Sequence, residues 1–227
     1  FTSQIDCDTA ILNGRVEGAV SDLVRVARMN KSGAKVKPQI ATAAYWQLFT
    51  NRNSRIRQLN QLDDKMVAMT RYSVTDMLAD HVVDSAKLKS ERVFKVQIND
   101  VNVRLQMMLN NEMDAMFVTE PQATLARLAK HKVLLDTRKM NWHMGVIAFR
   151  EKPMKDVDRK RQYDVFVKAY NQACDSLNKN GIARYAHLME KYCRTRSAVL
   201  DSIPKTKFPH AVGPREKDVL RAEKYIK

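Results

Sequence analysis

The segment "NNEMDAMFVTEPQAT" (residues 110–124) decides the fold class, because it joins a polar break, an apolar run and a helix start. Residues 116–118 are apolar and indicate a buried strand, which runs out at Glu120. Pro121 then suits the first position of a helix, where its missing N–H needs no partner. A strand that turns directly into a helix predicts an α/β arrangement, and in open α/β sheets ligands bind at the carboxyl ends of the strands.

The same alternation of strand and helix extends over most of the chain. We expect strands at residues 19–24, 39–49, 66–72, 93–98, 115–118, 132–137 and 144–149. We expect helices at residues 8–18, from 73, from 100 and over 121–131, then long amphipathic helices from 155 onward, one of them ended by Gly181. The sequence therefore predicts an α/β fold with right-handed parallel crossovers and a helical C-terminal part.

The best-motivated binding site is the corner at residues 71–75. Ser73, with Asp76 three residues later, forms a capping-box pattern at the start of a helix. Backbone N–H groups at a helix N-terminus, beside two hydroxyls, suit a carboxylate, sulfonate or phosphate. The candidate ligand-binding residues are Arg71, Tyr72, Ser73, Val74 and Thr75. The alternatives are structural: Ser73 caps the helix, Tyr72 packs in the core and Arg71 lies on the surface.

Two further corners carry an acid where a strand ends. Residues 11–22 resemble residues 108–120, since each stretch has a helix end, Leu-Asn, a polar break, an apolar strand and an acid. Either the chain has two halves of similar build, or the likeness is coincidental. Glu120 either accepts hydrogen bonds from an amine, amidine or aminopyrimidine, or caps the following helix. Ser21 and Asp22 form the matching corner, with the same two interpretations.

Trp46 and Trp142 complete the candidate ligand-binding residues. Trp46, with Tyr45 beside it, either stacks on a ligand or packs in the core of an alternating strand. Trp142, with His143 beside it, either lines a cleft or has a plain structural role.

The chain carries a net charge of +15, and residues 150–227 hold 19 Lys and Arg against 10 Asp and Glu. Such a charge attracts nucleic acid, anionic lipid or an anionic ligand. The basic residues are interleaved with acids, as in "EKPMKDVDRKRQYD" (151–164), and no aromatic-rich strand accompanies them. A solvated basic surface is the alternative, so the charge alone assigns no function.

Several classes of site find no support in the sequence. Cys7, Cys174 and Cys193 show no CxxC spacing, and the five histidines show no metal-binding spacing. We expect no metal, no cofactor and unpaired cysteines, with a Cys174–Cys193 disulfide as the alternative in an oxidising compartment. No apolar run reaches the roughly 18 residues of a membrane span. No nucleophile–base–acid arrangement is visible, so we expect a binding protein and not an enzyme.

Three stretches resemble the type II periplasmic solute-binding proteins of ABC transporters, in particular the sulfonate, taurine, nitrate and thiamine-precursor binders. They are "LDDKMVA" (62–68), "LNNEMDAMFVTEPQATLA" (109–126) and "PREKDVLRAEKYI" (214–226). The likeness covers most of the chain. Asn111 stands where the family favours Gly, and it suits a helix end because Asn tolerates the left-handed conformation.

The resemblance implies a two-lobed fold of the Venus-flytrap kind, with a helical C-terminal part. Lobe one would comprise residues 1–62 and 144–227, and lobe two residues 63–143, with hinges near Leu62 and Met144. The family's opening strand, helix and strand have no counterpart in this chain. Ser3 and Asp6 lie near the family's second binding loop.

The resemblance also implies a function: the substrate-binding component of an ABC importer, a transport protein that captures a small polar solute, anionic or aminopyrimidine-like. The partners would be that solute and the membrane permease of the transporter. Residues 1–4 show no export signal. Family membership implies a periplasmic protein, or a lipoprotein anchored outside the inner or outer membrane.

Three alternatives stay open. A cleft enzyme of the menaquinone- or thiamine-precursor type would need an acid–base pair, for which Glu120 with His143 is the pair we nominate. An effector-sensing domain of a transcription regulator would need a helix-turn-helix before Phe1. Nucleic-acid binding by the basic C-terminal part, the least favoured, would weaken steeply with salt.

Overall fold

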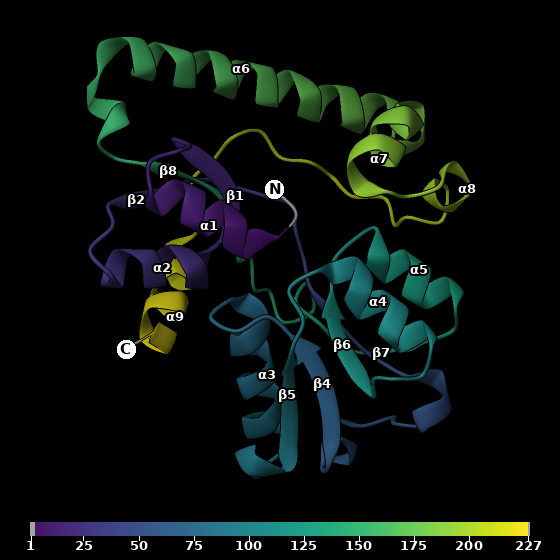
Figure 1. The fold of residues 1–227 in the computed structure, drawn as a ribbon. Helices are drawn as coiled ribbons and strands as arrows, with labels where there is room; N and C mark the ends of the chain where they lie inside the picture. Colours follow the sequence, from purple (N-terminus) through teal and green to yellow (C-terminus); the bar gives the residue numbers. More distant parts are fainter. Residues whose placement is uncertain (1–2, 227) are drawn as a thin grey trace. The chain divides into compact units, whose positions relative to one another are not determined.

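The computed structural model describes residues 3–226 and divides the chain into two compact units (Figure 1). Unit 1 comprises Tyr45–Trp142 together with residues 3–5. Unit 2 comprises Asp6–Ala44 and residues 143–226. The chain therefore passes from unit 2 into unit 1 after Ala44 and returns after Trp142.

Unit 1 is built on a five-stranded sheet with the strand order β5-β4-β6-β3-β7. Its strands are β3 (Gln47–Thr50), β4 (Lys65–Met69), β5 (Val93–Gln97), β6 (Ala115–Val118) and β7 (Lys132–Asp136). β4 runs parallel to β5 and β6, whereas β3 runs antiparallel to β6 and β7. The carboxyl ends of β4, β5, β6 and β7 and the start of β3 therefore meet at one edge of the sheet, which we call the carboxyl edge.

Helices and an apolar core support this sheet. The helices of unit 1 are α3 (Val74–Ser85), α4 (Val101–Leu109) and α5 (Gln122–Leu128), with the short 3-10 helices η1 (Arg52–Ser54), η2 (Leu59–Leu62) and η3 (Ser90–Arg92). α3 packs against β4, while α4 packs against β6 and α5 (Figure 1). Phe49, Met108 and Met116 expose none of their surface. Full burial of such a side chain contributes roughly 2 kcal/mol to folding. The apolar core therefore stabilises the sheet that bears the carboxyl edge.

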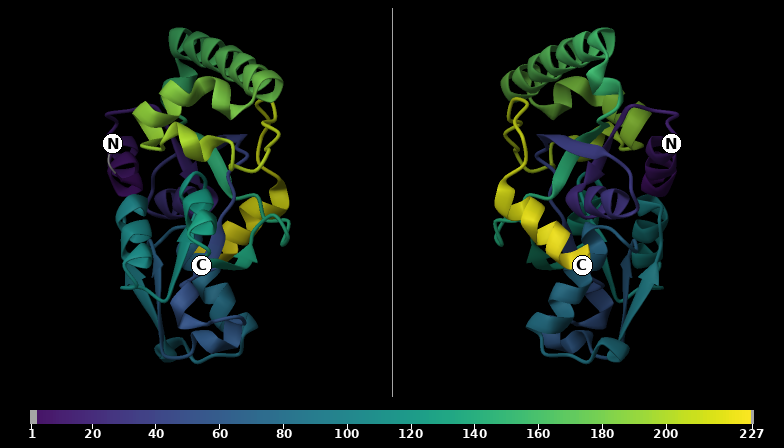
Figure 2. Two further views of the ribbon diagram at one scale, coloured as in Figure 1. Left: turned by 90° about the vertical axis from the view of Figure 1, so that its right-hand side faces the viewer. Right: turned by 90° about the vertical axis from the view of Figure 1, so that its left-hand side faces the viewer.

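Unit 2 is built on a three-stranded antiparallel sheet with the order β1-β8-β2. Its strands are β1 (Gly18–Asp22), β2 (Val36–Ala41) and β8 (Gly145–Arg150). Its helices are α2 (Leu23–Lys31), α6 (Val157–Asn180), α7 (Ala186–Cys193), α8 (Ser197–Leu200), α9 (Glu216–Ile226), most of α1 (Gln4–Leu12), and the 3-10 helices η4 (Pro153–Lys155) and η5 (Ile182–Tyr185). α9, yellow in Figure 2, packs against α2. The predicted helical C-terminal part is present, and α6 ends at Gly181 with a φ of +76°.

The stretch 39–49, which we predicted as one strand, forms parts of two strands in different units. β2 pairs with β8 in unit 2, whereas β3 pairs with β6 and β7 in unit 1. The chain therefore changes unit at residues 44–45 and not near Leu62, and residues 45–62 lie with the rest of unit 1. Apolar residues continue through the crossing without a turn signal such as Gly or Pro, so the pattern did not reveal it.

The beginning of the chain also differs from the prediction. Helix α1 starts at Gln4 and ends at Leu12, earlier than the expected helix at 8–18. The expected strand 19–24 ends at Asp22, because the Asp22 side chain accepts a hydrogen bond from the backbone N–H of Arg25 and caps α2. Helix α2 was missed, since its start lay inside the predicted strand.

The α/β fold class is confirmed, with fewer parallel pairs than expected. β4 pairs in parallel with β5 and β6, and the other strand pairs among residues 3–226 are antiparallel. Within the same residues, no helix is long and apolar enough to cross a membrane. Cys7, Cys174 and Cys193 are free thiols.

Candidate functional site

The corner between β4 and α3 is held together by its own hydroxyl groups. Ser73 is the N-cap of α3, and its Oγ accepts a hydrogen bond from the backbone N–H of Thr75 at 3.1 Å. The same hydroxyl donates to the carbonyl of Thr70 at 2.7 Å. Thr75 Oγ1 accepts from the backbone N–H of Thr70 at 2.9 Å. The two hydroxyls that the sequence offered to a ligand therefore build the turn, and Ser73 has the capping role.

The corner nevertheless presents donors that the fold leaves unused. Within residues 3–226, the backbone N–H groups of Ser73 and Val74 have no hydrogen-bond acceptor. Arg71 is exposed, and its guanidinium has no partner in the same part of the chain. The positive end of the helix dipole lies at these N–H groups. Backbone donors, dipole and guanidinium together form a surface suited to an anion.

Tyr72 lies beside these donors in a constrained backbone conformation. Its φ is +60°, in the left-handed region, and 49% of the residue is exposed. Its backbone N–H donates to Asp76 Oδ2 at 2.9 Å, and Lys95 Nζ donates to Asp76 Oδ1 at 3.0 Å. The predicted capping box is therefore shifted by one residue, since Asp76 bonds the residue before the N-cap. Asp76 thereby fixes the turn that carries Arg71 and Tyr72.

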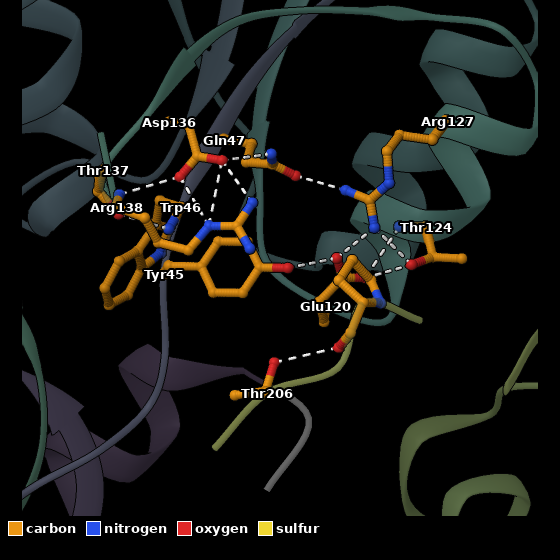
Figure 3. Close-up of polar contacts among 11 residues, drawn as sticks. Tyr45, Trp46, Gln47, Glu120, Thr124, Arg127, Asp136, Thr137, Arg138 and Thr206 are labelled. Atoms are coloured by element: carbon orange, nitrogen blue, oxygen red, sulfur yellow. Dashed lines mark hydrogen bonds and ion pairs between the residues drawn. The ribbon is translucent and has the colours of Figure 1, made fainter. Parts of the chain in front are cut away.

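Glu120, at the end of β6, accepts hydrogen bonds on both carboxylate oxygens (Figure 3). Tyr45 Oη donates to Oε1 at 2.7 Å, and Arg127 Nη2 forms an ion pair with the same oxygen. The backbone N–H and Oγ1 of Thr124 donate to Oε2 at 2.9 and 2.7 Å. Glu120 thus caps the first turn of α5 and holds Tyr45 and Arg127 in place.

The network continues from Arg127 across the carboxyl edge and closes on Tyr45 (Figure 3). Arg127 Nη1 donates to Gln47 Oε1 at 2.6 Å, and Gln47 Nε2 donates to Asp136 Oδ2 at 2.8 Å. Asp136 accepts from Nε and Nη2 of Arg138, whose guanidinium lies 3.8 Å above the centre of the Tyr45 ring. β3, β6, β7 and α5 are therefore joined at this edge by one ring of polar contacts.

The network changes how its members titrate. Burial raises the pKa of the Glu120 carboxyl, but hydrogen bonds from Thr124, Arg127 and Tyr45 outweigh it and bring the pKa below the ordinary 4.5. Burial also raises the pKa of the Asp136 carboxyl, but hydrogen bonds from Arg138 and Gln47 outweigh it and bring that pKa below its ordinary value. Burial, and then the bond to Glu120, raises the pKa of Tyr45. Both carboxylates are therefore ionised at neutral pH, and Tyr45 is neutral.

Unit 2 contains a corner of similar construction where β1 meets α2. Asp22 accepts from the backbone N–H of Arg25 at 3.0 Å and forms an ion pair with its guanidinium, which also binds Asp8. Ser21 is 6% exposed, and its Oγ has no hydrogen-bond partner within residues 3–226. The backbone N–H of Val24, in the first turn of α2, has no acceptor in that range either. Asp22 therefore serves the helix, while Ser21 and Val24 keep unused donors.

The two tryptophans are half-buried in unit 1. Trp46 precedes β3, and its backbone N–H donates to Thr137 Oγ1 at 3.0 Å. Trp142 packs against His81 of α3, with ring centroids 4.8 Å apart. Ser3 and Asp6 belong to the start of the chain and the first turn of α1. The ligand-binding role of Trp46 and Trp142 stays a prediction.

Four residues that complete the polar network were not predicted as site residues: Gln47, Arg127, Asp136 and Arg138. One signal was available for Arg127, since residues 120, 124 and 127 recur at helical spacing. Asp136 lies near the end of the predicted strand 132–137 and is the last residue of β7, so it is an acid at a strand end like Glu120. Gln47 and Arg138 gave no signal, because only the antiparallel pairing of β3 with β7 brings them together.

Metal and acid–base chemistry find no further support. No group of three or more His, Cys, Asp or Glu within residues 3–226 could hold a metal ion. Glu120 and His143, the pair nominated for an enzyme, belong to different units.

One family model matches most of the chain. The family model described as NMT1/THI5 like matches residues 2–180. The chain belongs to the NMT1/THI5-like family. A search among curated proteins finds no significant match to this NMT1/THI5-like sequence.

Solved structures share the fold of this NMT1/THI5-like chain. The alkanesulfonate-binding protein SsuA from Xanthomonas axonopodis pv. citri bound to MOPS is 16% identical with a TM-score of 0.77, over 99% of this chain and 78% of that one. The aliphatic sulphonate-binding SsuA from Escherichia coli is 17% identical with a TM-score of 0.74, over 100% and 73%. The nitrate-binding NrtA from Synechocystis PCC 6803 is 10% identical with a TM-score of 0.73, over 94% and 65%. The chain thus has the fold of periplasmic solute-binding proteins, and these neighbours are binding proteins, not enzymes.

Proposed function

We propose that this chain is the solute-binding component of an ABC importer and that its solute is a small anion. Family membership and the fold shared with import-system binding proteins support the binding role. The observation that carries the anion is the α3 corner. Its free backbone N–H groups at Ser73 and Val74 stand beside the exposed Arg71 in the same turn.

The state of Glu120 favours an anion over an aminopyrimidine-like solute. An aminopyrimidine would need an acceptor for its amino group, and Glu120 was the acceptor we nominated. Both of its oxygens are engaged by Tyr45, Thr124 and Arg127. A new donor would have to displace a bond to a partly buried carboxylate, which costs more than a new bond of the same kind returns.

Unit 2 carries donors of its own. Ser21 Oγ and the Val24 N–H are donors without partners in the described residues, at the strand-to-helix turn where β1 meets α2. We propose that the solute is captured by closure of two lobes, with hinges where the chain changes unit, after Ala44 and after Trp142. The membrane permease is the second partner, and the site of action is the periplasm or the outer face of a membrane to which the protein is lipid-anchored.

The test is a thermal-shift screen of wild type and Arg71→Gln against MOPS, methanesulfonate, nitrate, acetate, an aminopyrimidine and a DNA duplex. An anion at 100 times its dissociation constant adds about 2.7 kcal/mol to the free energy of unfolding, which raises Tm by several degrees. Arg71→Gln removes a charge-assisted hydrogen bond of about 1.5–3 kcal/mol. We therefore expect at least tenfold weaker anion binding with an unchanged Tm of the free protein.

Arg57→Gln is the matched control. Arg57 is exposed and follows η1 beyond the end of β3, at the opposite edge of the sheet, so the charge change is the same and the place different. Equal loss of anion affinity in both variants would show that Arg71 acts only through the net charge of the protein. A salt-sensitive shift with DNA alone would replace the solute-binding proposal by nucleic-acid binding.

A further inference from the structure

Helix α4 contains a buried arginine, Arg104. Arg104 is only 4% exposed, although it lies in a nine-residue helix and precedes the core residue Leu105. An arginine is almost never fully buried unless its charge is hydrogen-bonded, because removing the guanidinium from water costs several kcal/mol. The contacts of the Arg104 guanidinium should therefore explain why this residue is buried.

The Arg104 guanidinium binds three neighbouring strands at the carboxyl edge. Nη2 donates to Thr70 Oγ1 at 2.7 Å and to the carbonyl of Ile98 at 2.6 Å. Nη1 donates to the carbonyl of Phe117. Thr70 follows β4 directly, Ile98 follows β5 directly, and Phe117 lies in β6. One planar group thus fixes the ends of three adjacent strands relative to each other.

These contacts lead directly to the α3 corner. The Thr70 carbonyl accepts from Ser73 Oγ, and the Thr70 N–H donates to Thr75 Oγ1. The position of Thr70 therefore sets where the Ser73 and Val74 N–H groups lie. Because an anion site needs its donors held within a fraction of an ångström, fixing Thr70 serves binding as well as folding.

The same helix is tied to the corner of Glu120. Gln122 Nε2, at the start of α5, donates to Asn102 Oδ1 of α4 at 2.9 Å. Phe117, which accepts from Arg104, lies three residues before Glu120. α4 thus holds both corners of unit 1, one through Arg104 and one through Asn102 and Phe117.

We propose that Arg104 is a positioning residue of the anion site: its guanidinium aligns the ends of β4, β5 and β6 so that the α3 corner presents its free donors in one fixed arrangement. This inference rests on the proposed function for its purpose, but the alignment can be tested without any ligand. Arginine suits the task because its fork of N–H groups reaches several acceptors at once, which the single ammonium of lysine does not.

The test compares amide hydrogen exchange in Arg104→Lys and in Leu105→Ala. Leu105 is 3% exposed in the same helix, and its truncation leaves a cavity in the core without touching the strand ends. In Arg104→Lys we expect the amides of Thr70 and Thr75 to exchange at least tenfold faster relative to that of Leu48 in β3. In Leu105→Ala we expect all three amides to accelerate by a common factor. A common factor in Arg104→Lys as well would overturn the inference.

Binding of MOPS provides the second readout. If wild type binds MOPS, Arg104→Lys should lose at least tenfold in affinity at a temperature where it is fully folded, and Leu105→Ala less than threefold. Equal losses in the two variants would overturn the positioning role. If wild type does not bind MOPS, the failure concerns the proposed solute, and hydrogen exchange alone decides the role of Arg104.

Discussion

Glu120 shows, at the scale of a single residue, how contacts within the fold can occupy both oxygens of a carboxylate at a strand end. Its oxygens accept from the Tyr45 hydroxyl, from Thr124 and from Arg127. The sequence placed Glu120 correctly at the end of a strand and offered a ligand contact or a helix cap. The structure shows the cap. Tyr45 could not be predicted as a partner of Glu120, because the contact joins residues 75 positions apart.

Glu120→Gln should destabilise the protein in a pH-dependent way. The folded pKa of Glu120 is lowered, so its ionised form stabilises the fold above the unfolded pKa, and that stability is lost as pH falls through the folded pKa. We expect a loss of about 2 kcal/mol at pH 7. Urea unfolding should show the gap to wild type shrinking as the pH falls below about 4.5.

Glu112→Gln is the control for this change, since Glu112 is exposed in the same unit. Because its side chain is exposed, we expect this variant to lose less than about 0.5 kcal/mol at pH 7. A gap between wild type and Glu120→Gln that stays constant from pH 7 to pH 3 would show that the Glu120 charge does not stabilise the fold.

At the scale of elements, the likeness between residues 11–22 and 108–120 has a structural counterpart. α1 ends with Gly14 N–H donating to Ile11 O and Arg15 N–H to Ala10 O, and Gly14 has a φ of +70°. α4 ends with the same two bonds 97 positions later, and Asn111 there has a φ of +64°. The expectation that Asn111 tolerates the left-handed conformation is thus confirmed.

The two joints also continue alike. Each strand leads to an acid that accepts from an amide in the first turn of the next helix and pairs with an arginine of that helix: Asp22 with Arg25, and Glu120 with Arg127. The sequence predicted the joints because their signals are local. It missed α2 and the split between β2 and β3, since these depend on strand partners far along the chain.

Ser73→Ala should destabilise helix α3 by about 1–2 kcal/mol, because it removes the N-cap of Thr75 and the donor to the Thr70 carbonyl. Denaturant unfolding gives the free-energy difference. Ser85→Ala, at the exposed last residue of the same helix, should change stability by less than 0.5 kcal/mol. If the two variants lose equal stability, Ser73 does not act as the cap.

At the scale of the whole molecule, the fold class and the family could be predicted from the sequence, whereas the boundary of the first unit could not. The fold class could be predicted from the strand-to-helix corners, and the family from motifs such as that at residues 109–126. The boundary lies between two strands that are joined by an apolar run, so only their pairing separates them. The two units share the positive charge unequally. Asp6–Ala44 and His143–Lys227 hold 25 Lys and Arg against 14 Asp and Glu, so unit 2 contains most of the net charge of +15.

The central claim is that a small anion binds to the backbone donors of the corner between β4 and α3. The most direct test is an NMR titration of the labelled protein, in which methanesulfonate, nitrate, acetate and phosphate are added one at a time. For the anion that binds, the amide resonances of Ser73 and Val74 should shift together and saturate with one dissociation constant. No saturating shift at these two amides with any of the four anions would contradict the account.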